Sequence, residues 1–321
     1  MKLKGRTLLV LALLLFGGYA VYDYMQDKKI EDKKLTDSQL LTVNFEQIDQ
    51  VTIDRGGQVI SLKRSVDGWD VTSPLHDQAD NVVADDFVKN VATEKIIDVA
   101  REGGKIDWST FGLDKPLAKI TFMTTSGAKN SFEISEKRNF EENAFARRDG
   151  ENRVLIVNSI WQNRARKEVT DFRDRRVLRH KIASIDDFKL KNKAGTLEVA
   201  LKDGKWIVPN KKDFVLDQNK VREFLQVLVD AKASEFVDKM PVLKSLFTLN
   251  LKLGDKTWNA SVGQAADMKI YAQVSDPEFS LKLEPGALDK YIKASIEDLK
   301  PSSPSHDNNK DQAQLAGKEK R

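Results

Sequence analysis

The sequence repeats itself at an offset of 137 residues, with a one-residue slip in the first hairpin, and this repeat constrains the fold more than any other feature. Dispersed matches of this kind also arise by chance, but here they coincide with the same predicted elements. The repeat therefore predicts two similar modules in tandem. The matching pairs include Ile48 and Ile185, Trp69 and Trp206, Asp80 and Asp217, and Phe87 and Phe224.

Each copy has the pattern of strands, one helix, and more strands. Residues 50–55 and 59–63 alternate around Gly56-Gly57, which predicts a hairpin. Asp80 and Asp217 are suitable N-caps for the two helices, and Val221, Phe224, Leu225 and Leu228 form an apolar stripe of helical period.

The predicted fold class is α+β, with two tandem repeat modules of largely antiparallel sheet, each with one main helix, after an N-terminal transmembrane segment. A tail with almost no large apolar residue is expected to be disordered. The predicted segments are a signal anchor or signal peptide (1–24), a stalk (25–40), the first module (41–165), a basic connector (166–181), the second module (182–300) and the tail (301–321).

The N-terminus has the pattern of an export signal or a membrane anchor. Lys2, Lys4 and Arg6 precede an uncharged stretch from Thr7 to Tyr22. Two interpretations remain open. Tyrosines near the end of the stretch favour an uncleaved anchor, whereas the small residues of Gly18-Tyr19-Ala20 would suit cleavage. The excess of cations before the stretch predicts a cytoplasmic N-terminus, a single pass through the inner membrane and a periplasmic body in a Gram-negative cell.

Composition excludes several classes of function. The chain has no cysteine, which excludes disulfides and thiol chemistry, and its three histidines are far apart. The net charge of +4 comes from the N-terminal cations and the tail, so the body is neutral and has no overall footprint for nucleic acid. We therefore expect no metal, no cofactor and no nucleic-acid partner.

A set of short motifs resembles the bacterial family known as domain of unknown function 4340. The resemblance implies a membrane anchor with an exported body, in some members associated with ABC transporters. It implies no catalytic residues. The chain departs from the pattern at Ile134-Ser135, where Ile-Gly is expected, and the second module lacks the Gly-Leu-x-x-Pro step. The motifs are Gly68-Trp69 before Pro74, Ala79-Asp80, Phe111-Gly112-Leu113-Asp114-Lys115-Pro116, Phe145-Ala146-Arg147 and Asp171-Phe172-Arg173-Asp174-Arg175.

The basic connector is the most unusual segment of the chain. Asp171 and Arg175 have the spacing of a helical ion pair, which predicts a helix there. The connector is either a solvated, salt-bridged linker or a surface for anions, because arginine suits carboxylate and phosphate. The candidate contact residues are Arg164, Arg166, Arg173, Arg175, Arg176 and Arg179.

A second candidate is the loop around the Gly-Leu-x-x-Pro step. Glycine and proline there are expected to fix the backbone of a turn-rich loop, and a partner contact is the alternative. Its candidate residues are Trp108, Phe111, Gly112, Leu113 and Pro116.

No nucleotide-binding, hydrolase or metalloprotease motif is present. Neighbouring acids such as Glu141-Glu142 point in different directions along a strand or helix, so they do not predict a catalytic pair. The leading hypothesis is a non-enzymatic, membrane-anchored periplasmic accessory or scaffold protein of a membrane complex such as an ABC transporter. The alternative is an envelope module that binds anionic lipid or glycan, and the third is an enzyme with an unrecognised carboxylate site.

Overall fold

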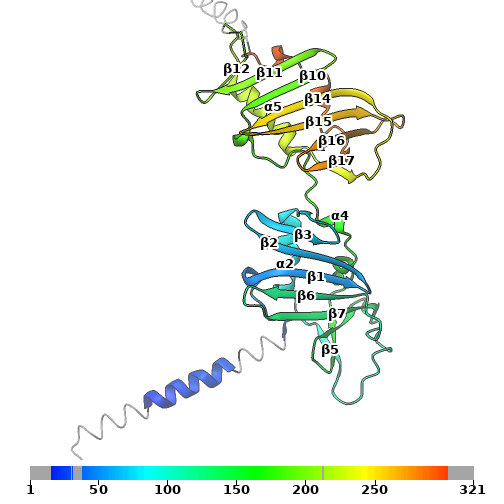
Figure 1. The fold of residues 1–321 in the computed structure, drawn as a ribbon. Helices are drawn as coiled ribbons and strands as arrows, with labels where there is room; N and C mark the ends of the chain where they lie inside the picture. Colours follow the sequence, from blue (N-terminus) through cyan, green and yellow to red (C-terminus); the bar gives the residue numbers. More distant parts are fainter. Residues whose placement is uncertain (1–15, 30, 32–37, 212, 303–321) are drawn as a thin grey trace, which may run out of the picture. The chain divides into compact units, whose positions relative to one another are not determined.

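The computed structural model describes residues 16–29, 31, 38–211 and 213–302. Residues 16–29 are helical. Among the described residues, no helix combines the length and the apolar composition needed to cross a membrane. The first part of the predicted signal segment, part of the stalk and nearly all of the predicted tail lie outside the described residues. The chain divides between Asp174 and Arg175 into two units, each of which has its own sheet (Figure 1).

The first unit is built on a nine-stranded antiparallel sheet in the order β4-β3-β2-β1-β6-β7-β8-β9-β5. A 3-10 turn, η1 (Phe45–Gln47), precedes the sheet, and the helices are α2 (Asn81–Thr93), α3 (Ile160–Ala165) and α4 (Val169–Phe172). The strands are β1 (Ile48–Arg55), β2 (Gln58–Ser65), β3 (Gly68–Ser73), β4 (Asp77–Gln78), β5 (Asp98–Glu102), β6 (Ala118–Thr124), β7 (Lys129–Arg138), β8 (Ala144–Arg148) and β9 (Arg153–Val157).

The second unit has an eight-stranded antiparallel sheet in the order β12-β11-β10-β14-β15-β16-β17-β13. Apart from β4, this is the strand order of the first unit. The helices are α5 (Gln218–Asp230) and α6 (Asp289–Ile292), with 3-10 turns η2 (Ile182–Ser184) and η3 (Ile296–Leu299). The strands are β10 (Asp187–Asn192), β11 (Gly195–Lys202), β12 (Lys205–Ile207), β13 (Ala233–Phe236), β14 (Lys244–Leu253), β15 (Lys256–Gln264), β16 (Ile270–Ser275) and β17 (Glu278–Leu283).

The main helices α2 and α5 begin in the same way. The Asp80 carboxylate accepts hydrogen bonds from the N–H groups of Val82 and Val83, and the Asp217 carboxylate accepts them from the two corresponding groups of α5. Such caps satisfy helix donors that have no partner within the helix. The next side chain, Asn81 or Gln218, accepts the N–H of the tryptophan in the adjacent strand.

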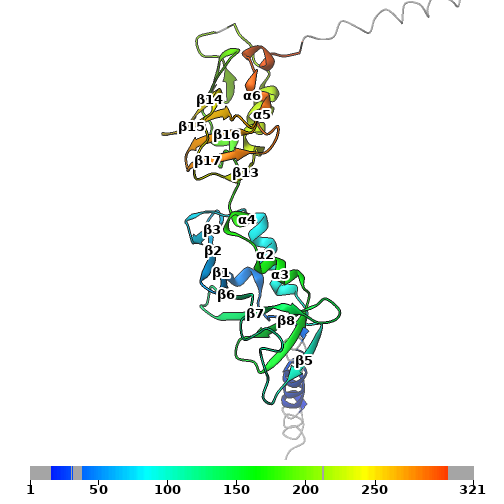
Figure 2. The same ribbon diagram turned by 90° about the vertical axis from the view of Figure 1, so that its right-hand side faces the viewer.

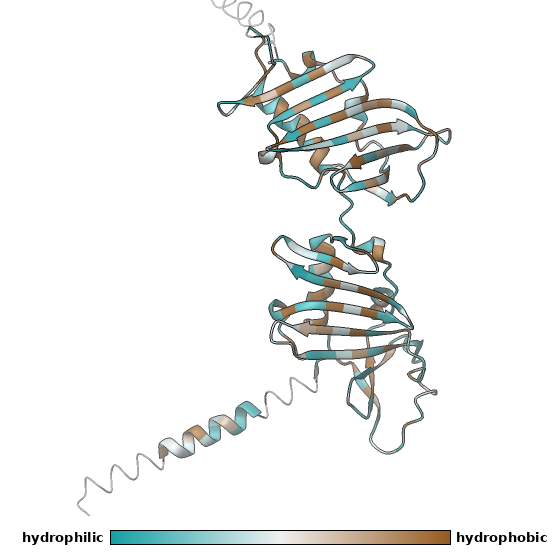
Figure 3. Ribbon diagram, in the orientation of Figure 1, coloured by the Kyte–Doolittle hydropathy of each residue, from teal (hydrophilic) through white to brown (hydrophobic). Residues whose placement is uncertain are grey.

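Each sheet buries one face against its main helix. Strands alternate between apolar and polar residues, which the colours of Figure 3 show. Figure 2 shows α5 and α6 on one side of the second sheet and α2 and α3 on one side of the first. In the second core, the buried Tyr291 hydroxyl donates to the Phe224 carbonyl at 2.5 Å, and burial raises the pKa of Tyr291. The fold is therefore α+β with two antiparallel sheets, as predicted.

Candidate functional site

The second half of the basic connector opens the second unit. The N–H of Val177 donates to the carbonyl of Ala231 at 2.9 Å, and Leu40 makes the equivalent bond to Glu94 in the first unit, also at 2.9 Å. Val177 and Leu178 are buried in the second core. This part of the connector is packed structure rather than solvated chain.

The first half of the connector closes the first unit. The N–H of Asp80 donates to the carbonyl of Phe172 at 2.7 Å, and Asp217 donates to Leu299 in the same way at 2.9 Å. Phe172 is buried and packs edge-on against Phe87. The connector therefore supplies the last packed segment of one unit and the first packed segment of the next.

The predicted helix through Asp171 and Arg175 is wrong. Helix α4 ends at Phe172, and Arg173 is extended. The Asp171 carboxylate accepts the N–H of Glu168 at 2.8 Å, as part of a capping box. Beyond Phe172 the backbone forms a bridge to Ala79, so pairing with the sheet edge replaces the helix.

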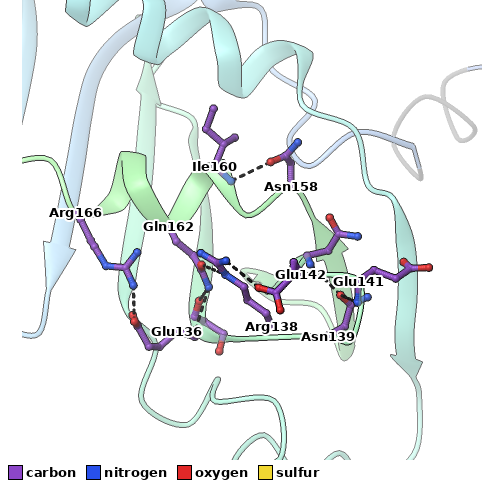
Figure 4. Close-up of polar contacts among 11 residues, drawn as sticks. Glu136, Arg138, Asn139, Glu141, Glu142, Asn158, Ile160, Gln162 and Arg166 are labelled. Carbon is purple, nitrogen blue, oxygen red and sulfur yellow. Dashed lines mark hydrogen bonds and ion pairs between the residues drawn. The ribbon is translucent and has the colours of Figure 1, made fainter.

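Three of the candidate arginines belong to the first unit and face its own carboxylates. The Arg173 Nε donates to Asp77 at 2.6 Å, and the two side chains are only 10% and 3% exposed. Arg166 pairs with Glu136 (Figure 4). Arg164 lies over the Trp161 ring, with its centre 4.8 Å from the ring centroid, and burial lowers its pKa.

The other three candidate arginines belong to the second unit. Arg175 accepts the N–H of Ala233 through its carbonyl at 2.8 Å, and Arg176 forms a backbone bridge to Lys232. The Arg179 guanidinium lies over the Phe279 ring at 4.7 Å. All three side chains are half-buried. The six arginines are thus divided between the two units, three in each. Their role in anion binding stays a prediction.

A buried polar network that the sequence does not predict braces the end of β7. Gln162, on α3, is fully buried and donates to the carbonyls of Ser135 and Glu136 at 2.8 and 3.1 Å (Figure 4). Its oxygen accepts the Nε of Arg138 at 2.7 Å. The β7–β8 pairing shifts register between Ile134 and Arg138, which frees these carbonyls from the ladder. A glutamine within a short helix gives no sequence signal of this role.

The loop of the Gly-Leu-x-x-Pro step covers a small apolar cluster of the first unit. This cluster lies on the face of the first sheet opposite α2 and is separate from the main core. Leu113 is buried with Ile106 and Val154, and Trp108 and Phe111 pack against them. Gly112 has φ +68°, and a Cβ there would lie 2.6 Å from the Ser135 hydroxyl.

Side-chain contacts hold this loop in place. Phe111 packs edge-on against Phe145 at 5.2 Å, and its carbonyl accepts the Ser135 hydroxyl at 2.6 Å. Arg147 stacks on Trp108 at 4.4 Å, and Pro116 is half-buried. The loop has the packed, turn-rich structure expected from its sequence, and a partner contact there stays a prediction.

Among the described residues, no group of three or more His, Cys, Asp or Glu side chains is arranged to hold a metal ion. Asp85 accepts the indole N–H of Trp69 at 2.9 Å, and Glu142 pairs with Arg138 at 3.1 Å. These acids have structural partners.

A family model described as domain of unknown function DUF4340 matches residues 69–245, which is more than half of the chain. The chain belongs to the DUF4340 family. No curated protein matches the chain. No solved structure matches it either.

The DUF4340 match confirms the resemblance drawn from the motifs, and all but the first residue of those motifs lie within the matched range. It begins at Trp69, in β3, and ends at Ser245, in β14. The match therefore spans parts of both units. The DUF4340 motif residues described above make packing contacts and turns. In this chain these residues therefore have structural roles in the fold.

Proposed function

We propose that this DUF4340 protein is a non-enzymatic, membrane-anchored accessory or scaffold protein of a membrane complex, and that its two units lie in the periplasm. The observation that carries the proposal is the exposed apolar surface of the helix at residues 16–29. Its large apolar and aromatic side chains are all more than half exposed; they are Phe16, Tyr19, Val21, Tyr22, Tyr24 and Met25. Six such side chains on one short segment favour burial in lipid or against a membrane partner.

The sequence before this helix supports the same proposal. The apolar residues from Leu8 to Phe16 run directly into it, behind three cations. Together they make one segment of the type that anchors a protein with its N-terminus in the cytoplasm. A tether of this kind raises the effective concentration of both units near a membrane partner. The resemblance to transporter-associated family members makes an ABC transporter the partner to test first.

Membrane attachment is tested by alkaline carbonate extraction of membranes that contain the full-length protein with a C-terminal tag. We expect the wild type to stay in the membrane pellet, with its body accessible to protease only from the periplasmic side. Leu11→Arg with Leu14→Arg should abolish this retention, because charged side chains are costly within a bilayer. Val66→Arg, on a fully exposed turn, is the matched control. Release of the wild type by carbonate would overturn the anchor.

The partner is tested by mild detergent extraction and mass spectrometry of what copurifies. A permease and its ATPase in stoichiometric yield would support the accessory function. Bound lipid or glycan without a protein partner would contradict it and favour the ligand-binding alternative. The arginine variant Arg175→Gln with Arg176→Gln, at two half-buried positions, would then test whether the connector retains that ligand.

A further inference from the structure

One end of the first sheet carries exposed apolar side chains on three neighbouring elements. Phe140, in the turn between β7 and β8, is 93% exposed. Ile97, directly before β5, and Ile160, at the start of α3, are 51% and 45% exposed. We call these three residues the apolar rim. Large apolar side chains that gather at one place on a surface favour a contact with lipid or with protein.

Strand pairing brings the rim residues to the same end of the sheet. Strand β8 begins directly after the turn, and its first residue, Ala144, lies opposite Val157 at the end of β9. Ile160 follows in the next helix, and Figure 4 shows it at the same end as the labelled turn residues. The N–H of Ile97 donates to the carbonyl of Ile156, also at the end of β9, at 2.8 Å.

Hydrogen bonds fix the turn that presents Phe140 to solvent. The N–H of Asn139 donates to the carbonyl of Asn143 at 2.9 Å, and the Asn139 side chain accepts the N–H of Asn143 at 2.9 Å. Glu142 pairs with Arg138 at 3.1 Å, and the buried amide of α3 accepts the Nε of Arg138. Because the turn is already ordered, a contact through Phe140 costs little further loss of backbone freedom.

The second unit has the same turn without an aromatic residue. The N–H of Ala265 donates to the carbonyl of Lys269 at 3.0 Å, as in the first turn, and Ala266 takes the place of the rim phenylalanine. This second turn exposes Met268 two residues later. Ser234 takes the place of the rim residue before β5. Of the two turns, only the one in the unit next to the apolar helix along the chain presents an aromatic side chain.

The chain enters the first unit at this same end. The N–H of Leu40 donates to the carbonyl of Glu94 at 2.9 Å, and the N–H of Ile96 donates to the carbonyl of Ser38 at 3.0 Å. The rim residue Ile97 follows directly. From residue 29 of the apolar helix to residue 38, the chain spans at most about 30 Å. This end of the sheet is therefore within reach of the surface of a membrane that holds the helix.

We propose that the apolar rim docks on the surface of the bilayer that holds the anchor, with Phe140 at the level of the lipid headgroups. The proposal rests on the proposed membrane attachment. Aromatic and aliphatic side chains are suited to this interface, and the tether makes a weak contact effective. Arg138 is paired with Glu142, and the neighbouring Glu141 is exposed and acidic, so the turn favours neutral over anionic lipid.

The test uses single spin labels, because the chain has no cysteine of its own. The full-length protein is placed in phosphatidylcholine vesicles and labelled at Glu141→Cys, which leaves Phe140 in place. Ala266→Cys, in the equivalent turn of the second unit, is the matched control, and Leu14→Cys reports on the anchor. Power saturation measures collisions of each label with oxygen, which concentrates in lipid, and with a nickel chelate, which stays in water and is present on both sides of the vesicles.

We expect the label at Glu141→Cys to collide with the nickel chelate about fivefold less often than the label at Ala266→Cys, and more often with oxygen, because it lies at the lipid interface. Phe140→Asp in the same labelled protein should raise the nickel collisions to the level of the control, because a charged side chain does not enter the interface. Unchanged circular dichroism shows that this variant is folded.

Three results would overturn the docking. Full nickel access at Glu141→Cys, with Leu14→Cys in lipid, would exclude the docking and leave the anchor standing. Nickel access at both labels would exclude the anchor as well. Few collisions of the Glu141→Cys label with either reagent would show a protein contact, and in these vesicles the only protein is a second copy of this chain.

Discussion

Gly68 shows how two constraints can meet on one residue. Its φ is +126°, and a Cβ at this position would lie 2.1 Å from the Asn81 Oδ1. That oxygen accepts the N–H of Trp69 at 2.8 Å, so it cannot move aside without breaking the link between β3 and α2. Gly195 shares the unusual φ, at +130°, but has open space around it.

Gly68→Ala should therefore destabilise the first unit more than Gly195→Ala destabilises the second. Overpacking at a fixed site costs about 1–3 kcal/mol, and we expect a difference of that size. Urea denaturation followed by tryptophan fluorescence measures it. Equal losses in the two variants would mean that the backbone strain, and not the clash with Asn81, sets the cost.

The buried amide of Gln162 supports a second prediction. Replacement by leucine would leave two backbone carbonyls and the Arg138 Nε without the partner that Gln162 supplies. Unsatisfied buried groups cost about 1–3 kcal/mol, so Gln162→Leu should lower the free energy of unfolding by that amount or more. Gln226→Leu, on the exposed side of α5, should stay within about 0.5 kcal/mol of the wild type. Comparable losses would contradict a role for the network.

Asp187 gives a prediction about pH. Burial raises the pKa of this carboxyl above its usual 3.8, and the neighbouring Glu198 adds to the effect. The folded state then holds the proton more tightly than the unfolded state, so ionisation of Asp187 reduces stability as pH rises from 3.8 through the raised pKa. Asp187→Asn should raise the unfolding temperature at pH 7 and leave it nearly unchanged at pH 3. A gain of the same size at both pH values would exclude ionisation as its cause.

At the scale of elements, the sequence predicts well the helices and hairpins whose formation depends on residues within the same segment. Helices α2 and α5 follow from Asp80 and Asp217 and from apolar residues of helical period, and the first hairpin follows from Gly56-Gly57. Strand β4 and the bulge in β7 were not predicted, and helix α4 ends earlier than the Asp171–Arg175 spacing predicts. Each is short and held by distant partners, which local patterns do not encode.

The candidate site shows the same limit. The arginine-rich composition of the connector is visible in the sequence, but the partners of its arginines are not. Asp77 lies far from Arg173 along the chain, and only the fold brings them to 2.6 Å.

The connector also gives a prediction at this scale. If residues 175–181 are an integral part of the second unit, polar substitution of its buried Leu178 should destabilise that unit severely. Leu178→Ser should cost at least about 2–5 kcal/mol, the range for large-to-small changes in a core. Val242→Ser, at a 95% exposed loop position, is the matched control. Hydrogen exchange of α5 reports the effect, and unchanged protection in Leu178→Ser would show that the segment is a linker after all.

At the scale of the whole molecule, the two units have separate hydrophobic cores. One core runs from Leu40 to Phe172 and the other from Val177 to Leu299, and they share no residue. Units with separate cores are expected to unfold separately, which breaks two-state behaviour. Leu62→Ala in the first core and Leu225→Ala in the second should each shift only one of two transitions in guanidinium chloride, by about 2–5 kcal/mol. Trp69, Trp108 and Trp161 report on the first unit by fluorescence, and Trp206 and Trp258 report on the second. A single transition that both variants shift equally would mean that the two units fold as one. A ligand that binds one unit would then also stabilise the other.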